Sequence, residues 1–233
     1  MKLSELRTFS RLSLPGAKKN RITNTQLDTI INVSANDVNI HLGLLPQDSK
    51  FNVKADQYKY DLSDSEETVE RFTAIDNLGL YWNSGTAASP DWSRMETKTL
   101  KWLGNNFPQW RDAGSGDPQY YAKKGRYLYL YPTPDTALTD GFWLYFIEKA
   151  PTMSANGDYP FGNSVEIPEF SILSDVIIKR VEWWIAPMFT KGVSKANILA
   201  EYFAMIEEKR ALLNKNLDIT SSKNARMSLK KVC

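Results

Sequence analysis

Hydrophobic and polar positions alternate with a period of two near the middle of the chain, most clearly in two adjacent segments. Residues 125–135 read Gly-Arg-Tyr-Leu-Tyr-Leu-Tyr-Pro-Thr-Pro-Asp, which puts leucines on one face of a predicted strand and tyrosines on the other. Residues 141–150 alternate in the same way between two sets of large apolar side chains. Eight residues, 132–139, separate the two runs, and we expect the strands to pair antiparallel across this connection.

Neither of these predicted strands has a polar face. A sheet that borders water on one side normally alternates apolar with polar residues. Both sides must therefore be covered, by a second sheet, a helix or a neighbouring subunit. We expect protein rather than a stacked ligand to cover the face formed by Tyr127, Tyr129 and Tyr131, and we assign these three residues to a subunit interface.

Shorter apolar runs precede these two strands. They lie within residues 51–62 and 69–81, and the acidic stretch Asp61–Glu70 lies between them. We interpret residues 94–103 as a further strand that ends in a turn at Gly104. Several short strands punctuated by turns are typical of an all-β sandwich or barrel.

Helical spacing of apolar residues marks both ends of the chain. At the N-terminus, residues 2–14 predict a short helix, and a longer helix runs to Leu42 from a cap at Thr23 or Asn24. At the C-terminus, one helix begins at Pro168 and ends near Pro187. A last helix follows Ser194 and ends near Leu217, and its apolar sector is too wide for contact with only one neighbour.

The order of elements is therefore helix, helix, β-region, helix, helix. We predict an α+β fold in which residues 1–45 and 166–217 form a helical bundle. An antiparallel β-sandwich or barrel-like domain, residues 46–165, is inserted into this bundle. Residues 218–233 form a basic C-terminal tail, which we expect to be disordered in the free subunit because it has few apolar anchors.

Composition places the chain among ordinary globular proteins. Of its 233 residues, 42% are hydrophobic and 24% charged, and no apolar run is long enough to span a membrane. The N-terminal residues lack the apolar core of a signal peptide. Cys233 is the only cysteine, so an intrachain disulfide is impossible and a reducing compartment fits.

The net charge of +2 hides an asymmetry. Residues 219–233 carry Lys223, Arg226, Lys230 and Lys231 and no acidic side chain, and without these four the chain has 25 basic and 27 acidic residues. The body is therefore no general nucleic-acid binder, whereas the tail is suited to an acidic partner.

The inventory of reactive residues argues against an enzyme. His41 is the single histidine, so a histidine–cysteine metal cluster cannot be built, and phosphate-loop, dinucleotide and nucleophile-elbow motifs are missing from the sequence. Asp61, Asp64, Glu66 and Glu67 could hold a cation, but a solvated acidic loop is the expected role. We expect no cofactor.

Aromatic residues are abundant, with seven tryptophans and eleven tyrosines. Most should pack in the core, and the remainder suit either a sugar-stacking face or a large protein interface. A carbohydrate-binding module with an aromatic β-face is therefore the alternative function. The apolar strands and the wide helix stripe favour the interface.

Several short motifs occur in an order that resembles the head–tail adaptor (connector) proteins of tailed bacteriophages, the group that includes the tail tubular A proteins of short-tailed phages. The motifs are Pro108-Gln-Trp110, Gly116-Asp-Pro-Gln-Tyr120, Tyr131-Pro-Thr-Pro-Asp135, Pro151-Thr-Met-Ser154 and Ile167-Pro-Glu169. The resemblance covers most of residues 23–216. The chain departs from it in a longer insertion at residues 85–95, a loop at 162–164 and the basic tail.

The resemblance implies a homo-oligomeric ring of twelve copies, matched to the portal, that extends the DNA channel and docks the next tail or neck protein. DNA would pass through without specific binding. It further implies a virion protein of the head–tail junction, made in the host bacterial cytoplasm and without membrane contact. The helical end would face the portal, with Lys223, Arg226, Lys230 and Lys231 meeting acidic groups there. We assign Asp61, Asp64, Glu66 and Glu67 to the lumen or rim of the ring.

Overall fold

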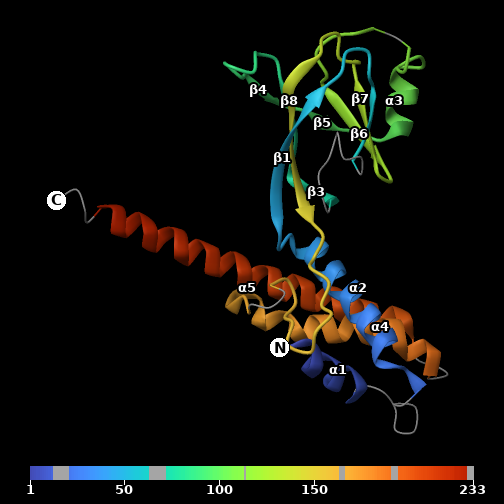
Figure 1. Ribbon diagram of the computed structural model, residues 1–233, viewed down its shortest axis with the longest axis vertical. Coiled ribbons are helices and arrows are strands. Elements are labelled where there is room, and N and C mark those ends of the chain that lie inside the picture. The colour runs from blue at the N-terminus through green and yellow to red at the C-terminus, as the bar shows by residue number, and fades with distance from the viewer. Residues whose placement is uncertain (13–20, 63–71, 113, 163–165, 190–193, 230–233) are drawn as a thin grey trace. The chain divides into compact units, whose positions relative to one another are not determined.

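A computed structural model of the chain describes residues 1–12, 21–62, 72–112, 114–162, 166–189 and 194–229 (Figure 1). The chain divides into two compact units. A helical unit comprises Met1–Leu44 and Ala150–Cys233, and a β-unit comprises Leu45–Lys149. The fold is α+β, as predicted.

The helical unit contains four α-helices and one 3-10 turn among the described residues. They are α1 (Leu3–Leu12), α2 (Asn24–Leu42), η2 (Pro168–Leu173), α4 (Ser174–Phe189) and α5 (Lys195–Leu229). The predicted start of α2 is correct, because the Thr23 hydroxyl accepts from the backbone N–H of Gln26 and the Gln26 side chain accepts from the N–H of Thr23. Gly43 ends the helix with φ 64°, a left-handed conformation that suits glycine.

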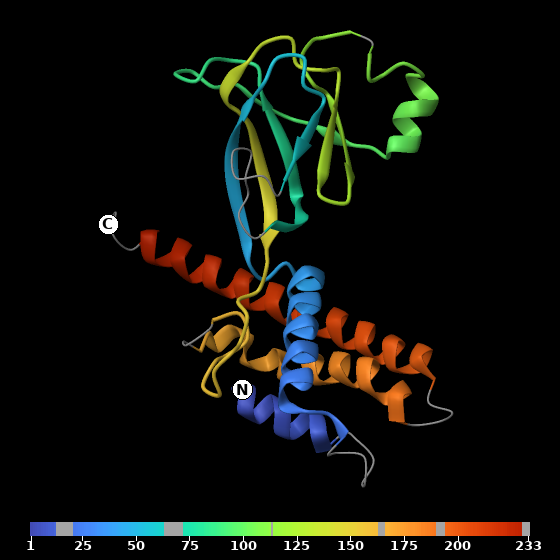
Figure 2. The same ribbon diagram turned by 45° about the vertical axis from the view of Figure 1, so that its right-hand side comes forward.

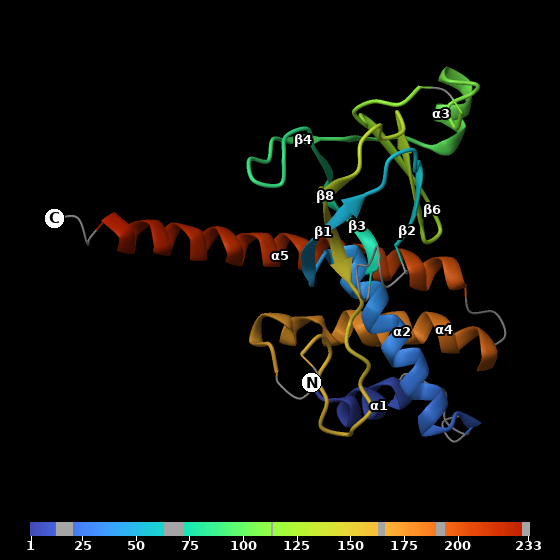
Figure 3. The ribbon, with the colours of Figure 1, turned by 45° about the horizontal axis from the view of Figure 1, so that its top comes forward.

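Apolar stripes on these helices pack against one another. Figure 3 shows α4 and α5 side by side, with α2 crossing them. Fully buried residues come from all four helices, among them Leu6, Leu27, Ile31, Val38, Val181, Ile185 and Tyr202. Burial of such side chains contributes about 1.5–3 kcal/mol each relative to exposure.

The described residues 150–162 belong to the helical unit, whereas we assigned residues 46–165 to the β-domain. Two asparagines of α2 account for this. The Asn32 side chain donates to the carbonyl of Met153 at 3.0 Å and accepts from its N–H at 2.8 Å, and Asn36 accepts from the N–H of Ala150 at 3.1 Å. These side chains therefore hold the segment that contains Ala150 and Met153 against α2. Without them, the backbone groups of Ala150 and Met153 would lack these hydrogen-bond partners.

The last helix is longer than its apolar pattern predicts. α5 continues through Leu229, so the predicted end of this helix near Leu217 is wrong. Residues 218–229 contain no glycine or proline, and helical hydrogen bonding continues without a breaker even where apolar periodicity stops.

The β-unit contains two four-stranded sheets (Figure 2). The first, sheet A, has the order β1 (Pro46–Val53), β8 (Leu138–Glu148), β3 (Phe72–Asn83), β4 (Trp92–Arg94). The second, sheet B, has the order β2 (Lys59–Asp61), β7 (Tyr127–Tyr131), β6 (Tyr120–Lys124), β5 (Glu96–Thr97). Strand pairs are antiparallel except for β5 and β6, which run parallel.

The two sheets form a sandwich around one core. Leu128 and Leu130 of β7 face Phe142, Leu144 and Phe146 of β8 within this core. The prediction that β7 and β8 pair with each other is therefore wrong. The connection between them carries the chain from one sheet to the other, and their apolar faces meet across the core instead of through a hydrogen-bonded ladder.

The predicted strand at residues 94–103 is also wrong in its second half. Strands β4 and β5 are followed by α3 (Leu100–Asn106), a helix capped by the Thr99 hydroxyl, which accepts from the N–H of Trp102 at 3.0 Å. This helix and the segment after it cover the outer face of sheet B, and α3 lies on the far side of β6 and β7 in Figure 2.

Candidate interaction surfaces

The tyrosine face of β7 is covered largely by its own chain. The Tyr131 ring lies 4.3 Å from the ring of Phe107, and the Tyr129 ring lies 6.0 Å from that of Trp110 in an edge-to-face contact. Tyr127 instead lies beside Lys59, whose Nζ is 3.8 Å from the ring centroid. The segment after α3 therefore covers Tyr129 and Tyr131 in part, and all three tyrosines remain half-buried.

A different aromatic surface lies on the outer side of sheet A. Trp143 and Tyr145 of β8, Tyr81 of β3 and Trp92 of β4 are all half-buried, and we call them, together with Lys50 and Arg94, the Trp143 face. Our sequence interpretation missed this surface. Its signal was the second set of aromatic residues in 141–150, but only the structure shows that these rings gather on the outer side of sheet A and stay partly exposed.

The rings of the Trp143 face pack at tilted angles and are not stacked parallel. Trp143 lies 4.9 Å from Tyr145, 5.5 Å from Trp92 and 6.3 Å from Tyr81, with interplanar angles of 34°, 62° and 48°. The indole N–H of Trp143 donates to a carboxylate oxygen of Asp48 at 2.8 Å. Such contacts hold the rings in fixed orientations.

Charge surrounds this aromatic surface. The Nζ of Lys50 is 5.4 Å from the ring centroids of both Trp92 and Trp143, and Arg94 donates to the backbone carbonyl of Asn77 at 2.6 Å. Partial loss of solvation raises the pKa of the Tyr145 hydroxyl, and the negative charge of Asp48 acts in the same direction. The tyrosine therefore remains neutral at physiological pH.

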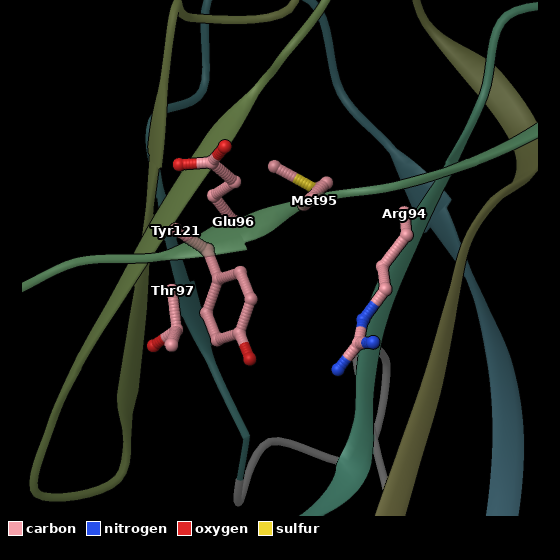
Figure 4. A pocket seen from close by; sticks show the side chains of 5 residues that line it. All are labelled: Arg94, Met95, Glu96, Thr97 and Tyr121. Carbon is pink, nitrogen blue, oxygen red and sulfur yellow. The ribbon is translucent and has the colours of Figure 1, made fainter.

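A pocket of about 380 Å³ lies beside the Trp143 face, where the chain passes from β4 to β5. Figure 4 shows that Arg94 and Tyr121 point to one side of it while Glu96 points to the other. Its charged groups do not converge on a common point, so the pocket provides no evident ligand site.

The exposed side of α5 is the third surface. Ala200, Ala204 and Ala211 are exposed along it, flanked by three exposed glutamates, Glu201, Glu207 and Glu208; we call these six residues the α5 face. Phe203 and Leu212, at its two borders, are 43% and 41% exposed. The wide apolar sector predicted from the sequence therefore extends into solvent in the isolated chain.

The remaining predicted site residues fall mostly outside these surfaces. Asp61 ends β2 and forms an ion pair with Arg126 at 3.0 Å, whereas Asp64, Glu66 and Glu67 lie outside the described residues. Lys223 and Arg226 belong to the helical backbone of α5, although their side chains are not described, and Lys230 and Lys231 also lie outside the described residues.

His41 occupies a packing position near the end of α2. Its Nδ1 is 2.7 Å from the carbonyl oxygen of Asp37, and its ring meets the rings of Tyr202 and Phe203 edge on. Burial raises the pKa of the Tyr202 hydroxyl. No group of three potential metal ligands exists among the described residues, and no helix within them is both long and apolar enough to cross a bilayer.

Comparison with known proteins adds a single finding. The family model described as SU10 adaptor protein matches residues 1–227, almost the whole chain. No curated protein gives a significant match.

Proposed function

The chain belongs to the SU10 adaptor protein family, and from this premise we propose that it forms a ring between the head and the tail of a bacteriophage. The family consists of structural phage proteins and is not an enzyme family, and membership implies a virion location. In our proposal, copies of the chain assemble below the portal, extend the DNA channel and dock the next tail component. The match over residues 1–227 carries this conclusion.

The surfaces described above support a ring. Closed rings are built from heterologous contacts, in which two different patches of each subunit meet. The Trp143 face and the α5 face lie on different units of the chain. The first leaves aromatic rings partly exposed, and Phe203 and Leu212 are exposed at the borders of the second. An isolated monomer has little use for two such surfaces.

Charge supports passage of DNA rather than its capture. The β-unit carries 12 Lys and Arg residues against 15 Asp and Glu residues, and the whole chain has a net charge of only +2. Tight binding to duplex DNA requires several phosphates to be neutralised by Lys and Arg. A nearly neutral subunit suits a channel through which DNA moves without specific contacts.

The C-terminal end of α5 is our proposed contact with the portal. Lys223, Arg226, Lys230 and Lys231 concentrate positive charge in a segment that has no acidic side chain after Asp218. Such a segment suits an acidic groove of the partner. Contacts of this kind weaken as salt rises, because exposed charges are screened beyond about 8 Å at physiological ionic strength.

Light scattering of the purified chain, alone and mixed with portal rings, tests the proposal. We expect a ring-sized complex at least in the presence of portal. A chain that stays monomeric in both conditions and binds immobilised glycans instead would support the carbohydrate-binding alternative. That alternative is the weaker one, because Tyr129 and Tyr131 contact Trp110 and Phe107 of their own chain.

A further inference from the structure

We propose that the Trp143 face of one copy packs against the α5 face of a second copy, and that this contact joins neighbouring subunits. The inference rests on the proposed ring, which requires two different and complementary surfaces on each subunit. Beyond the ring itself, the inference identifies the two surfaces that meet between neighbouring subunits.

The Trp143 face has the chemistry of a protein contact. Sugars and bases stack on flat, exposed ring faces, whereas the rings here meet each other at angles of 34° to 68°. The Trp143 indole N–H is already bonded to Asp48, and one N–H of Arg94 is bonded to the carbonyl of Asn77, which leaves the other guanidinium donors available to a carboxylate. Trp, Tyr and Arg are the residues most enriched at the energetic centres of protein interfaces.

Positive charge at both ends of the face specifies an acidic partner. The strand register places Lys50, Trp143, Tyr81 and Arg94 in one row across sheet A. Neighbouring strands lie about 4.8 Å apart, so the row is roughly 14 Å long. The partner must therefore accept bulky aromatic rings at its centre and present carboxylates on both sides of them.

The α5 face meets these requirements. Successive helix residues are rotated by about 100°, so Ala200, Ala204 and Ala211 form a shallow central stripe. Glu207 lies on one side of this stripe, and Glu201 and Glu208 lie on the other. A helix with its side chains is about 10–12 Å wide, which is comparable with the separation of the two cations. Aromatic rings would pack on the alanines while the glutamates meet Lys50 and Arg94.

The glutamates already have partners within the free subunit, and these pairs are exchangeable. Glu201 is 2.8 Å from Lys179, Glu207 pairs with Arg210, and Glu208 is 3.9 Å from Lys209. The three glutamate side chains remain 61%, 67% and 65% exposed. Exposed ion pairs are weak and are screened by salt, so a desolvated contact with a neighbouring copy can replace them.

Reversing the charges of each face separately provides the test. One variant carries Lys50→Glu with Arg94→Glu, and the other carries Glu201→Lys, Glu207→Lys and Glu208→Lys. All five positions are exposed, so each variant should keep its fold, as checked by circular dichroism. Ring formation is measured by mass photometry under the condition in which the wild type assembles. A Lys101→Glu/Lys124→Glu variant, altered at exposed positions outside both faces, is the matched control.

Each variant alone should lose assembly, because like charges then meet at every contact. The protein concentration needed for rings should rise by roughly tenfold or more. An equimolar mixture should recover assembly, since alternating copies restore opposite charges at every contact. Two results would overturn the surface assignment while leaving the proposed function intact. One is that each folded variant, on its own, assembles as well as the wild type and the control. The other is that the mixture fails to recover assembly. A wild type that forms rings under no condition would overturn the proposed function itself.

Discussion

Replacing Tyr129 with serine tests whether the tyrosine face of sheet B is covered by its own chain. Tyr129 is half-buried, and its ring meets Trp110 edge on at 6.0 Å. Truncation of a fully buried aromatic residue costs about 3–5 kcal/mol, and an aromatic pair contributes about 0.5–1.5 kcal/mol beyond its buried area. For this half-buried ring we expect the free energy of unfolding to fall by about 2 kcal/mol. The melting temperature should fall by roughly 4–8 °C.

Urea denaturation followed by tryptophan fluorescence measures the loss. A double-mutant cycle with Trp110→Ala should give a coupling free energy of about 0.5–1.5 kcal/mol. Tyr127→Ser is the matched control, and it should cost less than about 1 kcal/mol because the Tyr127 ring contacts the exposed cations Lys59 and Arg126. An unchanged free energy of unfolding with lost ring assembly would refute the reasoning, because a neighbouring subunit would then be the cover.

Three further substitutions test other parts of the account. Asn32→Ala should lower the free energy of unfolding by about 1–3 kcal/mol in urea titrations, since it leaves the buried N–H and carbonyl of Met153 without their side-chain partners; an effect below about 0.5 kcal/mol would argue against this anchor. Asp158 accepts from the N–H groups of Ala155 and Ser154, which lower its pKa. The Asp158 carboxylate therefore adds to the free energy of unfolding above the unfolded pKa of about 3.9, and this contribution disappears as pH falls through the folded value. The loss of unfolding free energy that Asp158→Asn causes at pH 7 should shrink on acidification. A loss that does not change with pH would contradict this. Truncation after Asp218 should leave the core folded but weaken loading onto portal, increasingly as salt is raised; equal loading at every salt concentration would remove the docking role of the segment.

Local rules were enough to predict much of the helical unit. The start and end of α2 follow from the capping box at Thr23 and Gln26 and from Gly43, all of which act within a few residues. The strand character of residues 127–131 likewise follows from alternation alone. These features are encoded by neighbours in the sequence, so no knowledge of the tertiary structure is needed.

Sheet pairing depends on residues far apart in the sequence, so local sequence patterns could not predict it. Alternation places Leu128 and Phe142 on apolar faces, but it does not say whether the two strands share a ladder or face each other across a core, as they do. At residues 100–106 an apolar run fits either a strand or a helix, and the cap at Thr99 favours the helix.

The candidate surfaces were the least predictable part. Both sides of residues 141–150 are apolar, and only the complete sheet order shows that Trp143 remains half-exposed. The sequence pointed to an interface, but it placed that interface on Tyr129 and Tyr131, which contact their own chain. Exposure is a property of the assembled fold, and residue type alone does not determine it.

The central claim is that the chain forms a ring between head and tail. Cryo-electron microscopy of the head–tail junction in virions that contain this protein tests it most directly. We expect a closed ring of copies directly below the portal, with a lumen continuous with the DNA channel. A junction in which this chain is missing, or is present as separate copies that do not touch one another, would contradict it.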